Sequence, residues 1–224
     1  MKPWELLGEA STPDGHEMRL TARDGEFVIL LDGKTLMSSR LHGSEEELAL
    51  SACRHVSGRR KPTVLVGGLG MGFTLRATLN LLPVDATIVV SELMAAVVDW
   101  NSTGALAALA GHPLQDPRVQ VLMEDVGVTL RDGTERFDAI LLDVDNGPSA
   151  FTSDENQELY DNDGVAAAHA SLKTGGALAV WSAAEDQTYE RRLRSHGFEA
   201  SARRVRARPN KGGARHTIFL GLKP

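Results

Sequence analysis

The sequence contains a single cysteine, Cys53, among its 224 residues. One cysteine excludes a disulfide framework within the chain and argues against a cysteine-based metal site, so we expect no metal. Two further absences are a run of 18 apolar residues and, near the start of the chain, the apolar region of a signal peptide. From these two absences we expect a cytoplasmic protein with no membrane partner.

Positive charge is in deficit over the whole chain, where 24 Lys and Arg face 30 Asp and Glu for a net charge of -6. This balance does not favour a nucleic acid as the default partner. The segment from Arg191 to Arg215 differs, because it holds nine Lys or Arg and one acid, Glu199. Two interpretations stay open: a charged edge strand that blocks sheet-to-sheet pairing, or a flank that contacts RNA phosphates.

The first quarter of the chain has the pattern of a small β-element. Residues 16–40 alternate between apolar and polar and are broken at Asp24-Gly25 and Asp32-Gly33, which are strong hairpin turns. Residues 44–56 then predict a helix, with Ser44 and Glu47 as its capping box. We therefore expect a β-meander followed by a helix.

From residue 62 onward, apolar strands alternate with helices. Runs such as "TVLVG", "ATIVVSE" and "FDAILLDV" lack polar alternation, which indicates parallel strands buried on both faces. Helices are expected at 73–81, 94–109 and 154–172, with another that ends near Gly197, and a hairpin closes the chain. The sequence predicts an α/β fold with a doubly wound, Rossmann-like sheet, divided into domains 1–60 and 61–224.

A glycine-rich turn ends the first of these strands. In "VLVGGLGMGF", Gly67 and Gly68 are followed by Gly70 and Gly72, one residue tighter than the G-x-G-x-x-G of dinucleotide folds. Such glycines let the backbone approach a ligand and present N–H groups to it. The alternative is a tight turn that needs glycine for its backbone angles alone.

Acidic residues end the next two strands. Glu92, 20 residues after Gly72 and followed by Leu93, can accept hydrogen bonds from both ribose hydroxyls. Glu124 and Asp125 end the following strand, where a carboxylate can accept from the adenine amino group. Taken alone, each acid could instead be a solvated residue at a helix start. Together they predict a nucleoside site, and S-adenosylmethionine fits it better than NAD because the pyrophosphate spacing is absent.

Two aspartates, Asp143 and Asp145, end the fourth strand, which normally lies beside the first. A group there would meet the sulfonium of the cofactor, and a carboxylate can position an amine and accept its proton. We therefore take both as candidate catalytic residues and Asp143 also as a cofactor contact. The alternative for one of them is a cap on the turn at Gly147-Pro148.

These motifs, in this order from about Leu30 to Trp181, resemble the spermidine synthase family. The family consists of aminopropyltransferases built on the seven-stranded class I methyltransferase sheet. The resemblance implies that Glu92 binds ribose, that Asp125 lies near adenine and that Asp143 activates the accepting amine. It also implies a homodimer in which the meander takes part.

The chain departs from the family at several positions. The family motif G-G-G-D-G-G carries an aspartate that binds the aminopropyl ammonium of decarboxylated S-adenosylmethionine, and the aligned position here is Gly70. Leu36 stands near the place of a family glutamine, no tyrosine occurs in "LHGSEEEL", and the double-aspartate loop is shortened to "DVDNGP".

A glycine at position 70 does not repel the carboxylate of intact S-adenosylmethionine. We therefore expect methyl transfer to a small amine-type or other nucleophilic acceptor. The alternatives are aminopropyl transfer in polyamine synthesis, RNA methylation, and nucleoside binding without catalysis.

Overall fold

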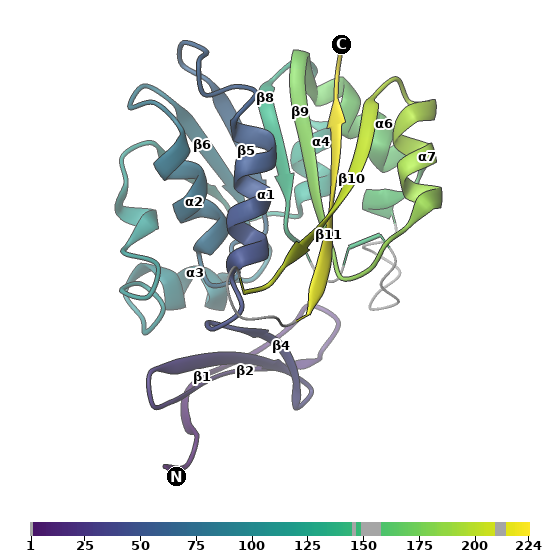
Figure 1. Ribbon diagram of the computed structural model, residues 1–224. Helices are drawn as coiled ribbons and strands as arrows, with labels where there is room; N and C mark the ends of the chain where they lie inside the picture. The colour runs from purple at the N-terminus through teal and green to yellow at the C-terminus, as the bar shows by residue number, and fades with distance from the viewer. Residues whose placement is uncertain (1, 145–146, 149–157, 209–213) are drawn as a thin grey trace.

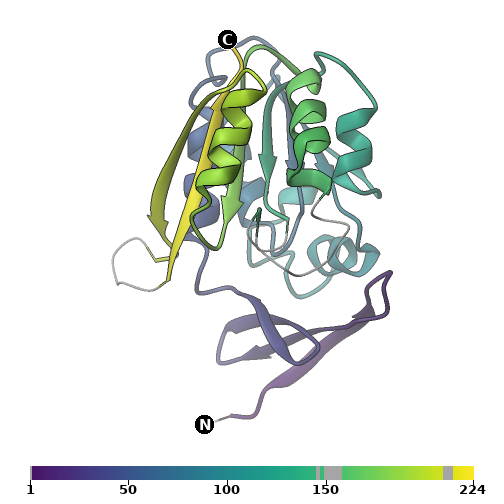
Figure 2. The same ribbon diagram turned by 90° about the vertical axis from the view of Figure 1, so that its right-hand side faces the viewer.

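The computed structural model describes residues 2–144, 147–148, 158–208 and 214–224. It contains a four-stranded and a seven-stranded sheet (Figures 1 and 2). The parallel strands of the large sheet run toward the small sheet, so their carboxyl ends face it (Figure 1). This edge is where open α/β sheets bind ligands.

The small sheet is an antiparallel meander in the order β1-β2-β3-β4. Its strands are β1 (Glu5–Ser11), β2 (Glu17–Arg23), β3 (Glu26–Leu31) and β4 (Lys34–Ser38). The predicted turns are confirmed, because Asp24 and Asp32, like the glycines after them, have positive φ angles. Strand β1 was not expected. It is an exposed edge strand, and its sequence therefore shows little alternation.

The large sheet has the order β10-β11-β9-β8-β5-β6-β7 and confirms the predicted fold. All strands are parallel except β11. From β5 the chain continues to β6 on one side and later returns to β8 on the other, so a topological switch point lies at β5. The strands are β5 (Thr63–Gly67), β6 (Thr87–Ser91), β7 (Val119–Leu122), β8 (Phe137–Leu142), β9 (Leu172–Ser182), β10 (Glu199–Arg206) and β11 (Arg215–Leu222).

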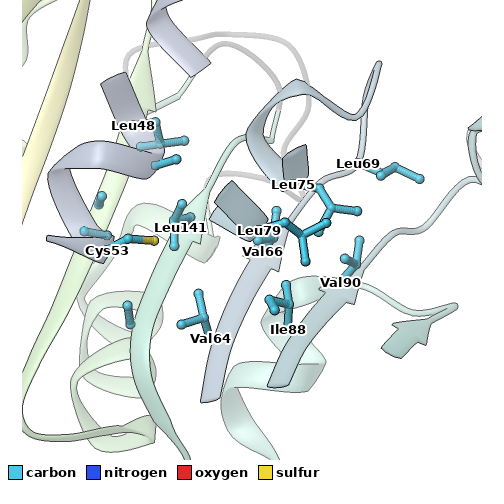
Figure 3. Packing of buried hydrophobic residues seen from close by; sticks show 14 of the residues in the cluster. Leu48, Cys53, Val64, Val66, Leu69, Leu75, Leu79, Ile88, Val90 and Leu141 are labelled. Carbon is cyan, nitrogen blue, oxygen red and sulfur yellow. The ribbon is translucent and has the colours of Figure 1, made fainter. Parts of the chain in front are cut away.

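Helices cover both faces of the large sheet (Figures 1 and 2). The strand side chains alternate between them: Val64 and Val66 pack toward α1 and α2 (Figure 3), and Leu65 packs on the opposite face. One face carries α1 (Gly43–Cys53), α2 (Phe73–Leu81) and α3 (Ala95–Ser102), and the other α4 (Val126–Arg131), α6 (Asn162–Ser171) and α7 (Gln187–Ser195).

Several predicted helix ends differ from the observed ones. Helix α1 starts at Gly43 without a side-chain cap, because the Ser44 hydroxyl donates to Glu45 instead of a backbone group. Helix α3 ends at Ser102, before Gly104, and α6 is capped by Asp161. The short helix α4 was not predicted. The expected helix start near residues 152–153 lies outside the described residues.

The division of the chain near residue 60 stays a prediction. Helix α1, on the N-terminal side of that division, packs against α2 and against strands of the large sheet. Within the described part of the chain, no helix has the length and apolarity needed to cross a membrane.

The basic C-terminal segment begins in α7 and continues into β10, the edge strand of the large sheet. Three of its arginines are paired with acids: Arg194 with Glu190, Arg203 with Glu47, and Arg204 with Glu185. These pairings reduce the positive charge available to phosphates. They favour the interpretation of a charged edge that resists pairing with another sheet.

Candidate functional site

The glycine turn needs glycine for its backbone. Gly68, Gly70 and Gly72 have φ angles of 87°, 51° and 81°, in the left-handed region. A Cβ atom at Gly68 would lie 2.5 Å from the carbonyl oxygen of Asp143, so only glycine allows β5 and β8 to end this close together. These positions therefore need glycine for their backbone angles. The lack of a side chain at Gly68 lets the turn lie against Asp143, the predicted acid after β8.

The meander covers the turn at Gly70. A Cβ atom at this position would lie 3.3 Å from the sulfur of Met37 on β4. An acidic residue at position 70 would therefore have a strained backbone, and its side chain would begin in contact with the apolar side chain of Met37. Asn101 of α3, which the sequence analysis missed, donates a hydrogen bond of 2.8 Å to the Gly70 carbonyl. A single asparagine in a helix offered no sequence signal for this role.

Glu92 lies at the end of β6, as predicted, and its carboxylate holds the turn. Its two oxygens accept from the backbone N–H groups of Leu69, at 2.8 Å, and Met94, at 2.7 Å. The side chain is buried, and this burial raises the pKa of Glu92, although the backbone hydrogen bonds oppose the rise. Leu93 beside it stays 49% exposed, which leaves an apolar surface at the strand end.

The two acids after β7 make local hydrogen bonds. Asp125 caps α4 by accepting from the Gly127 N–H at 2.7 Å, and Glu124 accepts from the Thr129 hydroxyl at 2.7 Å. These bonds give both residues a structural task, and their contact with adenine stays a prediction. Met123, directly before them, is 51% exposed and adds a second apolar side chain near Leu93, because β6 and β7 are adjacent.

Asp143 follows β8 and lies next to the glycine turn. Its N–H donates to the Gly67 carbonyl at 2.9 Å, and its Oδ2 accepts from the Thr74 hydroxyl at 2.5 Å. Burial raises the pKa of Asp143 to about 6, and the bond from Thr74 limits this rise. A carboxylate with such a pKa is a better proton acceptor near neutral pH than an ordinary aspartate. Asp145, the second predicted aspartate, lies outside the described residues.

A further acid, Glu45, joins this site from the first turn of α1. Burial raises the pKa of Glu45 to about 7, and the negative charge of Asp143 adds to the rise. Ser44 donates to Glu45 at 2.7 Å, and His216 Nδ1 lies 2.9 Å from the Ser44 oxygen. The sequence contains no signal for Glu45, because acids in a first helical turn are also what the helix dipole favours.

Aromatic rings connect these elements. His42 stacks on Phe73, the first residue of α2, with ring centroids 4.4 Å apart. Trp181, at the end of β9, packs edge-on against His216 at 4.6 Å. Its buried indole nitrogen has no hydrogen-bond partner among the described residues. The site is thus bounded by α1, the start of α2, the ends of β8 and β9 and the start of β11.

Comparison by sequence relates the chain to polyamine aminopropyltransferases, although no family model matches it. It is 33% identical over 149 residues to polyamine aminopropyltransferase 2 of Ralstonia nicotianae, which covers 66% of this chain and 28% of that protein. Identity to the polyamine aminopropyltransferase of Corynebacterium efficiens is 29% over 177 residues, covering 77% of this chain and 32% of that one. The chain thus spans about a third of the length of these relatives.

Comparison by structure shows which solved proteins share the fold. A spermidine synthase in complex with the transition state analogue AdoDATO matches 98% of this chain and 72% of its own, with a TM-score of 0.73 and 18% identity. The spermidine synthase from Thermotoga maritima gives a TM-score of 0.72 at 16% identity. The strand order and the glycine turn define a Rossmann-like, class I methyltransferase-type α/β fold. Within this class, the chain is a divergent spermidine synthase-like protein.

Proposed function

We propose that this protein transfers an aminopropyl group from decarboxylated S-adenosylmethionine to an amine of a small polyamine-type acceptor. One observation carries the proposal: a chain 33% identical to a polyamine aminopropyltransferase places its glycine turn, Glu92 and Asp143 at adjacent strand ends. The glycine at position 70 predicted methyl transfer. The named relatives instead favour its alternative, aminopropyl transfer.

The nucleoside part of the donor would lie across the ends of β5, β6 and β7. In this proposal, Glu92 shares its carboxylate between the glycine turn and the ribose hydroxyls. The exposed side chains of Leu93 and Met123 would contact the faces of adenine, which prefer apolar neighbours. Glu124 and Asp125 would accept from the adenine amino group.

Asp143 would accept the proton of the attacking amine. The nitrogen lone pair forms a bond to the aminopropyl carbon next to the sulfonium, and the bond from that carbon to sulfur breaks. Its electron pair stays on sulfur, so a neutral thioether nucleoside leaves. The amine nitrogen then gives its extra proton to Asp143, whose raised pKa suits this step.

Methyl transfer is the second candidate, and Gly70 is the observation that favours it, because the turn itself carries no acid. The two reactions separate in one assay. Purified protein is incubated with 1,4-diaminobutane and either donor, and the products are analysed by mass spectrometry. We expect an aminopropylated diamine with the decarboxylated donor only. Methylated diamine from S-adenosylmethionine would contradict the proposal, as would an Asp143→Asn variant with undiminished turnover.

A further inference from the structure

We propose that Glu45 selects the donor. Its carboxylate, beside Asp143, holds the ammonium group of decarboxylated S-adenosylmethionine and repels the carboxylate of the intact form. This inference rests on the proposed function and deepens it. In this inference, helix α1 supplies the acid that binds the ammonium group, because the glycine turn of this chain carries no acid.

The position of Glu45 is fixed by its neighbours. The Gly43 N–H donates to the Ala207 carbonyl at 2.9 Å, which ties the start of α1 to the segment just after β10. The Ser44 hydroxyl donates to Glu45 Oε2 at 2.7 Å, and His216 of β11 lies within hydrogen-bond distance of that hydroxyl. Glu45 is thus a partly buried residue placed by strands of the large sheet, unlike a freely solvated helix acid.

Among the three successive glutamates at the start of α1, Glu45 differs from the other two. Glu46 pairs with His42 at 3.0 Å, and Glu47 pairs with Arg203. In the described part of the chain, Glu45 forms no ion pair with a lysine, arginine or histidine, and neither does Asp143. His42, just before α1, stacks on Phe73, and the next residue, Thr74, donates to Asp143, so the start of α1 lies beside the part of the site that holds Asp143.

Two neighbouring acids with no cation favour a positively charged ligand. Burial of Glu45 and the negative charge of Asp143 together raise the pKa of Glu45 to about 7. An ammonium group placed between them would offset this repulsion and restore both charges. A carboxylate in the same place would add a third negative charge, which is unfavourable. The pair therefore discriminates between the two donors by charge.

The pair also lies where the side chain of the donor would end. Asp143 contacts the glycine turn through the Gly67 carbonyl, and it contacts the first turn of α2 through Thr74. The turn supplies no acid of its own, and a side chain at Gly70 would start toward Met37. An acid from α1 can therefore take the place that an acid on the turn would have.

The test is a Glu45→Gln variant, with Glu46→Gln as the matched control. Glutamine keeps the shape of glutamate and can still accept from Ser44, so it removes the charge alone. Isothermal titration calorimetry measures the dissociation constants of decarboxylated and intact S-adenosylmethionine. We expect wild type to bind the decarboxylated form at least about 10-fold more tightly. Glu45→Gln should weaken that binding by about 10- to 100-fold, the usual scale for a charge-assisted hydrogen bond, and leave the intact form unchanged or tighter.

Glu46→Gln should keep the wild-type ratio of the two constants, because its side chain is exposed and paired with His42. A wild type without a preference, or one that binds neither donor, overturns the inference, and so does an unchanged ratio in Glu45→Gln. If Glu45→Gln does not fold, Glu45→Asp keeps the charge at a shorter reach and should give an intermediate ratio. A wild-type ratio in Glu45→Asp would then count against the inference.

Aminopropyl transfer is measured in parallel on the same preparations. The ratio of the two dissociation constants could depend on Glu45 while the protein shows no transfer activity. That result would contradict the proposed function and leave the inference standing. Transfer activity with a ratio that does not depend on Glu45 would overturn the inference alone.

Discussion

The Thr74 hydroxyl donates a hydrogen bond of 2.5 Å to Asp143 Oδ2 and joins the first turn of α2 to the end of β8. The bond stabilises the charged form of Asp143 and so opposes the effect of burial on its pKa. It also orients the carboxylate, because Thr74 is buried and its helix is fixed by the glycine turn. Thr74 is thus a positioning residue for the proposed base.

Replacement of Thr74 by valine should raise the pKa of Asp143. The methyl group replaces the hydroxyl at nearly the same size, and the charged form loses one hydrogen bond, which corresponds to about one pH unit. The acidic limb of kcat/KM against pH should therefore move to higher pH by about that amount. Thr78→Val is the control, because Thr78 lies one turn further along α2 and its hydroxyl donates to the Thr74 carbonyl and not to Asp143. An unmoved acidic limb in Thr74→Val would remove Thr74 from this role.

Glu92→Gln should weaken both nucleoside binding and stability. Two backbone N–H groups, of Leu69 and Met94, donate to different oxygens of Glu92. A glutamine amide offers one oxygen, so one of these donors would face its NH₂ group. The free energy of unfolding should fall by about 1–3 kcal/mol. Urea denaturation measures this, and calorimetry with S-adenosylhomocysteine should show about 10-fold or more weaker binding. Full stability together with full affinity would show that Glu92 neither holds the turn nor binds ribose.

Glu45→Gln should stabilise the ligand-free protein at high pH and not at low pH. The pKa of Glu45 is raised from 4.5 to about 7, so its contribution to stability is fully present below 4.5 and is lost as pH rises through about 7. The variant cannot acquire this buried charge. At about pH 8 its melting temperature should exceed that of wild type, by about 2–4 °C for each kcal/mol of unfolding free energy that the buried charge costs the wild type. The difference should vanish near pH 4.

Differential scanning calorimetry across this pH range measures the effect on Glu45→Gln, and Glu46→Gln again serves as the control. A melting-temperature difference that does not change with pH would assign the effect to packing instead of charge.

Asp138→Asn should destabilise the protein without changing the site. Asp138 bonds to Arg59 and Lys173, both at 2.7 Å, and accepts from the Thr63 N–H at the start of β5, away from the glycine turn. Burial raises its pKa, but these bonds outweigh burial and lower it, so this stability is present above its ordinary pKa and lost as pH falls. We expect a loss of about 1–3 kcal/mol at neutral pH.

Urea denaturation measures the loss in Asp138→Asn, with the exposed Asp132→Asn as control. The affinity for S-adenosylhomocysteine should equal that of wild type. A loss of affinity in a folded Asp138→Asn protein would show that the two ends of β8 are coupled.

The sequence by itself determined the parallel strands, the glycine turn and the acids that follow each strand. The runs around Val64 and Ile140 are apolar without polar alternation, apart from Asp138 near the start of β8, because both faces of those strands are covered by helices. Glu92 and Asp143 could be placed at strand ends because a strand ends where its apolar run does. These features depend on neighbours in the chain, so a local pattern predicts them.

Only the tertiary structure decided which distant residues share the site. Glu45, Thr74 and Asn101 come from three helices, and each is ordinary in its own segment. They converge because β8 pairs with β5 and because α1 packs on the face of the large sheet over β8 and the later strands. Strand order and helix packing depend on contacts between segments far apart in sequence. For that reason no local pattern of residues could show that the acid missing from the glycine turn has a counterpart on helix α1.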